Sequence, residues 1–179
     1  KLRLPAIGAS PDGVLMYENG EVGVLEVKNQ SPFEWAQRER WNRRDGAYVA
    51  CERKPHDSVG AWIIPQLQLE MLCVGPLCSH AMILSCTGLG GAKLFRVPRD
   101  DDLLRDMLRF AALFTTRFVD RKRAPPADFF SCELSGRAKE EYREMISGIR
   151  RNARRAEFIA TVPHDYIQRA HRDMHLFIS

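Results

Sequence analysis

The sequence predicts an α/β protein with a central mixed sheet flanked by helices. Short runs rich in β-branched and aromatic residues indicate strands, and segments 66–75 and 103–119 have helical periodicity. An Asn-Gly turn between the first two apolar runs is typical of a β-hairpin. With a hydrophobic content of 45%, the 179 residues can form one domain, or one domain with an extension.

The hairpin is predicted at residues 14–17 and 22–28. Side chains two residues apart share a face of a strand, so Glu26 and Lys28 are expected to project to the same side. The Ser-Pro-Asp-Gly turn that precedes the hairpin can hold Asp12 near Glu26.

These three side chains suit metal-assisted hydrolysis of a phosphodiester. Two carboxylates in a cleft repel each other unless a cation joins them, and oxygen ligands favour Mg²⁺ or Mn²⁺. The adjacent Lys28 can hold or deprotonate a water, or steady a phosphate oxygen. The alternative is a surface salt bridge between Glu26 and Lys28, with Asp12 as a simple turn residue.

The order of these residues resembles a known nuclease motif. Pro-Asp, then a hairpin, then Glu-x-Lys matches the PD-(D/E)xK nucleases. The flanking residues, with a Gln-Leu-Gln motif on a predicted helix, resemble the lambda exonuclease and YqaJ-like viral recombinase family. This resemblance spans somewhat more than the first half of the chain and rests on Ser10, Pro11, Asp12, Gly13, Glu26, Val27, Lys28, Gln66 and Gln68.

The resemblance implies a restriction-endonuclease-like core and a set of catalytic residues. Asp12, Glu26 and the backbone carbonyl of Val27 are expected to ligate Mg²⁺ (or Mn²⁺). Lys28 is expected to position or deprotonate the attacking water, and Gln66 to orient Lys28 or that water. The expected catalytic residues are therefore Asp12, Glu26, Lys28 and Gln66.

The function implied is a metal-dependent exonuclease that digests double-stranded DNA from an end, in the 5′ to 3′ direction, in recombination or repair. The resemblance also implies a ring-shaped homo-trimer and a single-strand annealing protein as partner. A structure-specific endonuclease or resolvase on the same core remains open, as does a catalytically inactive DNA-binding module. The Gln-x-Gln helix and the Ser-Pro-Asp-Gly turn favour the exonuclease.

Helices precede this motif in the resembled family, and one of them carries a further acidic residue near the metals. We therefore expect residues 1–120 to be a nuclease core without its N-terminal helices, and residues 121–179 to be a helical C-terminal extension.

Charge and cysteine content agree with an intracellular DNA-binding protein, in cytoplasm or nucleus, that is not secreted. The net charge of +4 and pI of about 8.9 fit a polyanion partner without requiring one. Five cysteines argue against a complete disulfide framework, so reduced thiols are expected. No apolar run approaches the roughly 20 residues of a membrane helix, so no membrane partner is expected.

The segment after the hairpin is predicted to be a helix at 33–41, begun by a Ser-Pro pair, followed by a loop at 42–59. Its basic residues are expected to meet the phosphate backbone, and the alternative is an exposed helix neutralised by neighbouring glutamates. The expected DNA contacts are Ser10, Arg38, Arg40, Arg43 and Arg44.

A helix is predicted to begin near Pro65 and to end at Gly75, and it places Gln66 and Glu70 on one face. Strands are predicted at 81–86 and 93–97. The three aspartates at 100–102 resemble a metal cluster, but their position before a helical pattern favours a helix N-terminus.

The C-terminal third is predicted to be largely helical. A linker or break with two prolines at 120–128 follows the helix at 103–119, and one or two helices are expected at 136–160. A cluster of arginines in this segment either binds phosphates or forms a solvated face; its members are Arg150, Arg151, Arg154 and Arg155.

Overall fold

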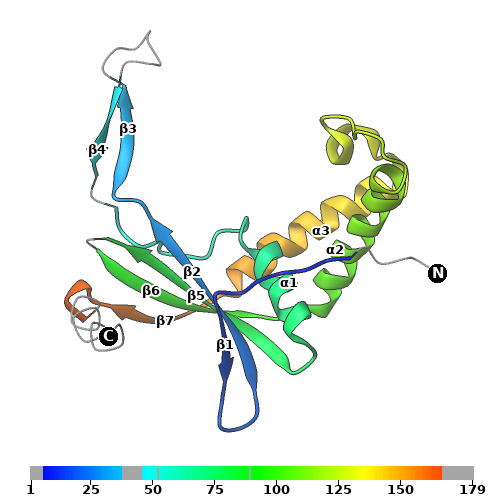
Figure 1. Cartoon of the computed structure of the whole chain (residues 1–179). Helices are drawn as coiled ribbons and strands as arrows, with labels where there is room; N and C mark the ends of the chain where they lie inside the picture. Colours follow the sequence, from blue (N-terminus) through cyan, green and yellow to red (C-terminus); the bar gives the residue numbers. More distant parts are fainter. Residues whose placement is uncertain (1–5, 38–45, 52, 89, 167–179) are drawn as a thin grey trace.

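The computed structural model describes residues 6–37, 46–51, 53–88 and 90–166. At its centre is a five-stranded sheet with the order β1-β2-β5-β6-β7 (Figure 1). β2 and β5 are parallel and the other neighbouring pairs are antiparallel, so the predicted mixed sheet is confirmed. The strands are β1 (Gly13–Met16), β2 (Val22–Gln30), β5 (Cys78–Thr87), β6 (Gly91–Pro98) and β7 (Glu157–Val162).

β1 and β2 form the predicted hairpin. In its turn, the Gly20 N–H donates to the Tyr17 carbonyl at 2.9 Å, and the Tyr17 N–H donates to the Glu21 carbonyl at 3.0 Å. Gly20 has a φ of 82°, in the left-handed region that glycine adopts without strain. The Asn-Gly pair therefore sets the register of the strand that carries Glu26.

Two predictions between β2 and the next helix are wrong. β3 (Phe33–Gln37) and β4 (Gly46–Ala50) pair as a separate antiparallel ribbon, which extends away from the central sheet (Figure 1). Residues 33–37 are thus a strand instead of the start of a helix. Residues 46–50 are a strand instead of a loop.

Side-chain chemistry explains the ribbon. Ser31, expected to cap a helix, instead accepts a hydrogen bond from the Phe33 N–H at 3.2 Å, which is a serine turn. Trp35 and Tyr48 lie opposite each other across the two strands, with ring centroids 5.2 Å apart. Such cross-strand aromatic pairs stabilise a ladder, and here they outweigh the local helix signal.

Within the described residues, three α-helices accompany the sheet. The predicted helix after Pro65 is confirmed. Proline lies in its first turn, and Gly75 follows its end with a φ of 126°. The helices are α1 (Ile64–Val74), α2 (Asp101–Phe114) and α3 (Gly136–Arg154).

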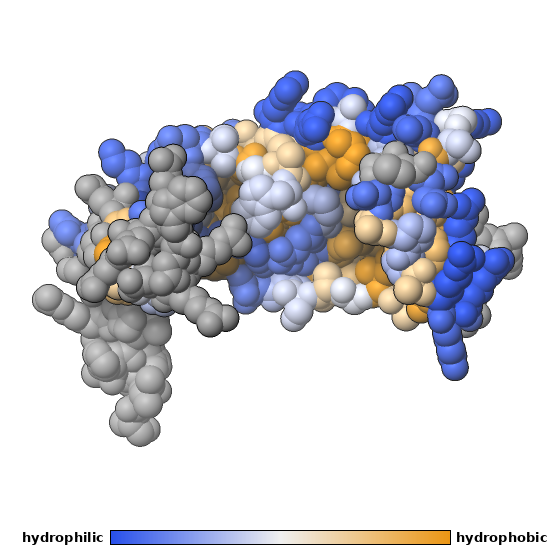
Figure 2. Space-filling view, turned by 90° about the horizontal axis from the view of Figure 1, so that it is seen from above, coloured by the Kyte–Doolittle hydropathy of each residue, from blue (hydrophilic) through white to orange (hydrophobic). Residues whose placement is uncertain are grey.

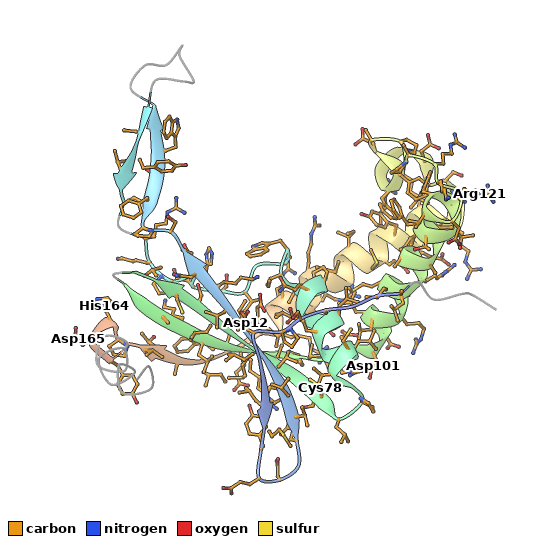
Figure 3. The ribbon with its side chains drawn as sticks, in the orientation of Figure 1. Asp12, Cys78, Asp101, Arg121, His164 and Asp165 are labelled. Carbon is orange, nitrogen blue, oxygen red and sulfur yellow. The ribbon has the colours of Figure 1, made fainter. Side chains whose placement is uncertain are left out.

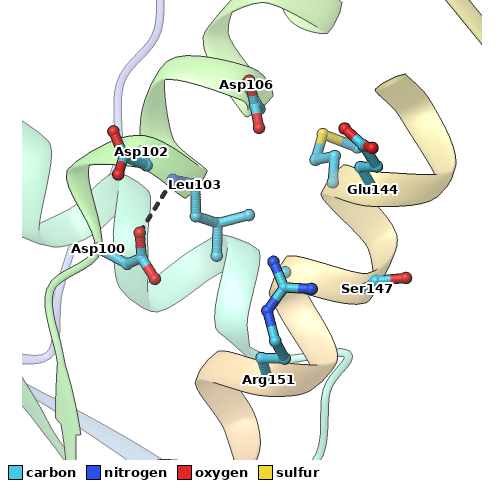
Figure 4. A pocket seen from close by; sticks show the side chains of 9 residues that line it. Asp100, Asp102, Leu103, Asp106, Glu144, Ser147 and Arg151 are labelled. Carbon is cyan, nitrogen blue, oxygen red and sulfur yellow. Dashed lines mark hydrogen bonds between the residues drawn. The ribbon is translucent and has the colours of Figure 1, made fainter. Parts of the chain in front are cut away.

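The consecutive aspartates mark the start of α2, as expected. The Asp100 carboxylate accepts a hydrogen bond from the Leu103 N–H at 3.0 Å and so caps the helix (Figure 4). Asp101 and Asp102 occupy the first turn, where negative charge is stabilised by the helix dipole. A π-helical turn, Thr115–Val119, continues α2 to the predicted end of the helix.

The C-terminal part is not purely helical. α3 ends at Arg154, and β7 follows at the edge of the sheet, paired with β6, so the helix predicted at 136–160 is wrong over β7. Phe158, Ala160 and Val162 recur at the two-residue period of a strand. This strand forms because it can pair with the free edge of β6. The described part after residue 120 thus supplies both a helix and a strand of the central unit.

One hydrophobic core joins the helices to one face of the sheet. That face carries Val24, Glu26 and Lys28, which occupy every second position along β2. The core includes Val24, Ile64, Leu67, Met71, Ile83, Phe95, Val97, Leu103, Phe110 and Ile149. This packing holds α1 against β2.

Within the described ranges, no helix has the length and apolar character that a membrane crossing requires. Cys51, Cys73, Cys78 and Cys86 are unpaired thiols, as the odd cysteine count suggested.

Candidate active site

The candidate site lies between β2 and the first turn of α1. The Lys28 Nζ lies 2.5 Å from the Glu26 Oε1, so both side chains project to the same side of β2, as predicted. Glu26 is only 4% exposed, whereas Lys28 is half-buried. A buried carboxylate requires a partner of opposite charge, and Lys28 provides one.

Gln66 joins the strand to the helix. Its Nε2 donates to the Glu26 Oε1 at 2.7 Å, and its Oε1 accepts a hydrogen bond from the Lys28 Nζ at 3.1 Å. α1 begins at Ile64, so Pro65 and Gln66 lie in its first turn, and the Gln66 amide points toward β2. Glu26, Lys28 and Gln66 therefore form one hydrogen-bonded cluster.

Asp12 approaches the cluster from the turn before β1, at the centre of the molecule (Figure 3). Its Oδ2 accepts a hydrogen bond from the Val27 N–H at 2.7 Å. The N–H and C=O of one strand residue point to the same edge, so the Val27 carbonyl faces the edge where Asp12 lies. Pairing between β1 and β2 ends at Gly13 and Leu25, which leaves this edge open at Val27.

Glu70 is a member of the cluster that the sequence did not assign to it. It is 1% exposed, and its Oε1 accepts a hydrogen bond from the Gln66 Nε2 at 2.8 Å. Burial raises the pKa of the Glu70 carboxyl above its ordinary value; the Gln66 hydrogen bond opposes this rise, and the charge of Glu26 adds to it. Its position four residues after Gln66 on one helix face was the available signal.

The donor atoms fit a hard cation. The expected ligands are the carboxylates of Asp12 and Glu26 and the Val27 carbonyl, all of them oxygens. Among the described residues no group of three or more acidic, histidine or cysteine side chains gathers to hold a metal. Magnesium bound by one or two carboxylates, with water and substrate phosphate as further ligands, does not need such a group. Close to this set, the buried Glu70 Oε2 has no hydrogen-bond partner.

The second glutamine of the Gln-Leu-Gln motif has a structural position. Gln68 is fully buried, and its Nε2 donates to the Pro98 carbonyl at 2.9 Å and to the Asn152 Oδ1 at 3.1 Å. Its Oε1 accepts the Asp100 N–H at 2.9 Å. Gln68 thus ties α1 to the end of β6 and to α3, while Gln66 faces the site.

The predicted DNA contacts divide into two groups. Ser10 is exposed, two residues before Asp12. The four arginines predicted to contact phosphates, Arg38, Arg40, Arg43 and Arg44, lie outside the described residues.

Comparison of the chain with protein-family models, with curated proteins and with solved structures finds no match. The fold class and the geometry of the site are therefore the basis for a functional proposal.

Proposed function

We propose that the chain is a Mg²⁺-dependent nuclease that hydrolyses the phosphodiester bonds of double-stranded DNA from an end. The observation that carries this proposal is the contact of Gln66 with both Glu26 and Lys28. These residues belong to segments far apart in the sequence, and Asp12 reaches the same strand through Val27. A simple surface salt bridge would not need a buried carboxylate and a bridging amide.

Asp12, Glu26 and the Val27 carbonyl would hold the ion, Mg²⁺ or Mn²⁺. The chemistry that such an ion supplies when bound is charge stabilisation at the scissile phosphate and activation of water. The Lys28 ammonium, fixed between Glu26 and Gln66, orients the attacking water or a phosphate oxygen by hydrogen bonding. Gln66 holds Lys28 and Glu26 in one geometry, which a loop-mounted group would not maintain.

Digestion of end-labelled linear and closed circular duplex DNA, with Mg²⁺ and with EDTA, tests the proposal. Metal-dependent digestion of the linear form alone supports an exonuclease, and the labelled end reports its polarity. Cutting of the circle replaces this proposal with an endonuclease or resolvase on the same core. Retention of DNA without cleavage replaces it with an inactive binding module.

The proposal extends to an intracellular role in recombination or repair with a single-strand annealing protein, and to a homo-trimer. Light scattering in solution measures the oligomeric state, and a monomer would contradict the trimer.

A further inference from the structure

α3 carries its charges in separate sectors. At about 100° per residue, four cations fall within a sector of roughly 60° on the helix surface. These residues, named the basic stripe, are Lys139, Arg143, Arg150 and Arg154. The acidic residues of α3 lie outside that sector; they are Glu140, Glu141 and Glu144.

The basic stripe lacks internal counter-charges. Among the described residues, none of its four side chains makes a hydrogen bond or ion pair. Other arginines of this region are paired: Arg105 with Asp102 at 2.7 Å, Arg137 with Glu141 at 2.9 Å, and Arg155 with Asp100 at 3.4 Å. The charge of the stripe is thus available to an external anion.

A different side of α3 is acidic. There α3 and the start of α2 enclose a pocket whose charged residues are Asp100, Asp102, Asp106, Glu144 and Arg151 (Figure 4). The arginine cluster noted in the sequence is therefore divided, with Arg151 in this pocket and Arg150 on the stripe. A solvated helix face does not require this segregation of charge.

Part of the stripe borders a groove of about 440 Å³ with an aromatic floor. Lys139, Arg143 and Arg150 line it together with Phe130 and Tyr142. The two rings stack, with centroids 5.1 Å apart and planes 11° from parallel. Seen from above, hydrophilic side chains gather along the margins of the helical half, with hydrophobic surface between them (Figure 2). The groove therefore combines cationic and aromatic side chains.

The helix that carries the stripe packs beside α1, the helix that carries Gln66. Asn152, on the face of α3 opposite to the stripe, accepts a hydrogen bond from Gln68 of α1. From Arg154 to Lys139 the helix rises about 22 Å, at 1.5 Å per residue. Roughly six base pairs of duplex DNA span this length. The stripe runs toward the end of the helical half where Arg121 lies (Figure 3).

We propose that the basic stripe of α3 binds the sugar-phosphate backbone of the duplex that extends from the candidate active site. The inference rests on the proposed nuclease function for the position of the DNA. The contact is independent of base sequence, because it neutralises phosphates and reads no base edges. It holds the duplex while the terminal nucleotide occupies the site.

Binding of a fluorescent blunt duplex in EDTA, measured by anisotropy over a series of salt concentrations, tests the stripe without cleavage. The test variant combines Arg143→Gln with Arg150→Gln. The control combines Arg105→Gln with Arg137→Gln, which removes the same charge from exposed, acid-paired positions. We expect the test variant to bind roughly tenfold more weakly and to lower the slope of log K against log salt by about 2. The control should retain the slope of the unmodified chain.

Equal slopes for test variant and control, with circular dichroism showing both folded, would overturn the stripe proposal. So would binding of anionic vesicles by the stripe without binding of duplex. Single-turnover cleavage with Mg²⁺ separates this proposal from the nuclease proposal, because the control variant should cleave as the unmodified chain does, while the test variant should need a higher DNA concentration to reach half its maximal rate. If nothing cleaves but the slopes differ as expected, the nuclease proposal fails and the stripe proposal stands.

Discussion

Glu70 accepts a hydrogen bond of 2.8 Å from the Gln66 amide, one helical turn earlier on α1. The same amide nitrogen donates to Glu26, and the amide oxygen accepts from Lys28. A buried acid on the helix therefore fixes the rotamer of the glutamine that organises the site.

Replacement of Glu26 by Gln, or of Lys28 by Ala, should reduce DNA cleavage about a hundredfold or more, because each removes a charged group from the proposed site. Initial rates with Mg²⁺ on linear duplex measure the effect. Lys54→Ala, at an exposed lysine outside the cluster, serves as the control. Full activity in either site variant, with an intact fold, would remove these residues from the mechanism.

The two glutamines of α1 should respond differently to replacement by alanine. Gln66→Ala should lower cleavage strongly, because Gln66 joins Glu26 to Lys28, and should also lower the stability, because it removes hydrogen bonds to the buried carboxylates of Glu26 and Glu70. Gln68→Ala should lower the free energy of unfolding by about 2–3 kcal/mol, because it removes three hydrogen bonds made by a fully buried side chain. Urea unfolding and cleavage rates on both variants measure the contrast. Similar losses in both quantities for both variants would contradict this division.

Glu70→Gln should stabilise the fold at neutral pH. Because burial raises the pKa of Glu70, the folded chain holds this proton more tightly than the unfolded chain. Its contribution to stability is therefore greatest below the ordinary pKa of 4.5 and declines as pH rises through the folded-state pKa. Removing the buried charge should add about 1–2 kcal/mol at pH 7 and little at pH 4.

Thermal unfolding at these two pH values measures the effect of Glu70→Gln. Glu144→Gln, at an exposed position of α3, is the matched control and should change neither value appreciably. A stabilisation of equal size at both pH values would show that charge burial is not its cause.

His80 should make stability fall in mild acid. Burial lowers the pKa of His80 below 6.5, and the charge of Arg96 acts in the same direction. The unfolded chain therefore binds this proton more readily, so the stabilisation is complete above pH 6.5 and is lost as pH falls through the folded-state pKa. Chemical unfolding between pH 7 and pH 5 should show this decline, and His80→Gln should flatten it. The His80 imidazole lies 2.9 Å from the Tyr17 hydroxyl, and His80→Gln changes this hydrogen bond as well. Tyr17→Phe removes the same hydrogen bond but keeps the imidazole, so it serves as the control.

Local sequence signals predicted the parts of the fold that short-range chemistry determines. The Asn-Gly turn, Pro65 with Gly75, and the Asp100 cap each appear where expected. The β3–β4 ribbon and β7 were missed because each strand forms only through pairing with another strand, β3 with β4 and β7 with the distant β6. A serine-proline pair favours a helix start in isolation, and the cross-strand rings override it.

The site shows the same limit. The face shared by Glu26 and Lys28 followed from strand periodicity, and the proximity of Gln66 followed from the family resemblance. The burial of Glu70 and the structural position of Gln68 depend on how α1 packs against β6 and α3. Helical periodicity places two residues on one face, but it does not say which face the sheet will cover.

The parallel pairing of β2 with β5 has a consequence for the order of folding. The hairpin can close early, since its strands adjoin in sequence, but β5 must return across the ribbon and α1 before it can pair with β2. The contact between Lys28 and Gln66, separated by 38 positions, depends on closure of this same long loop. A nascent chain that has completed the hairpin would thus present Asp12, Glu26 and Lys28 without the amide that joins them to α1. The arrangement of Lys28 with Gln66 is therefore complete only after the slow closure of this loop, and a partly folded molecule would lack it.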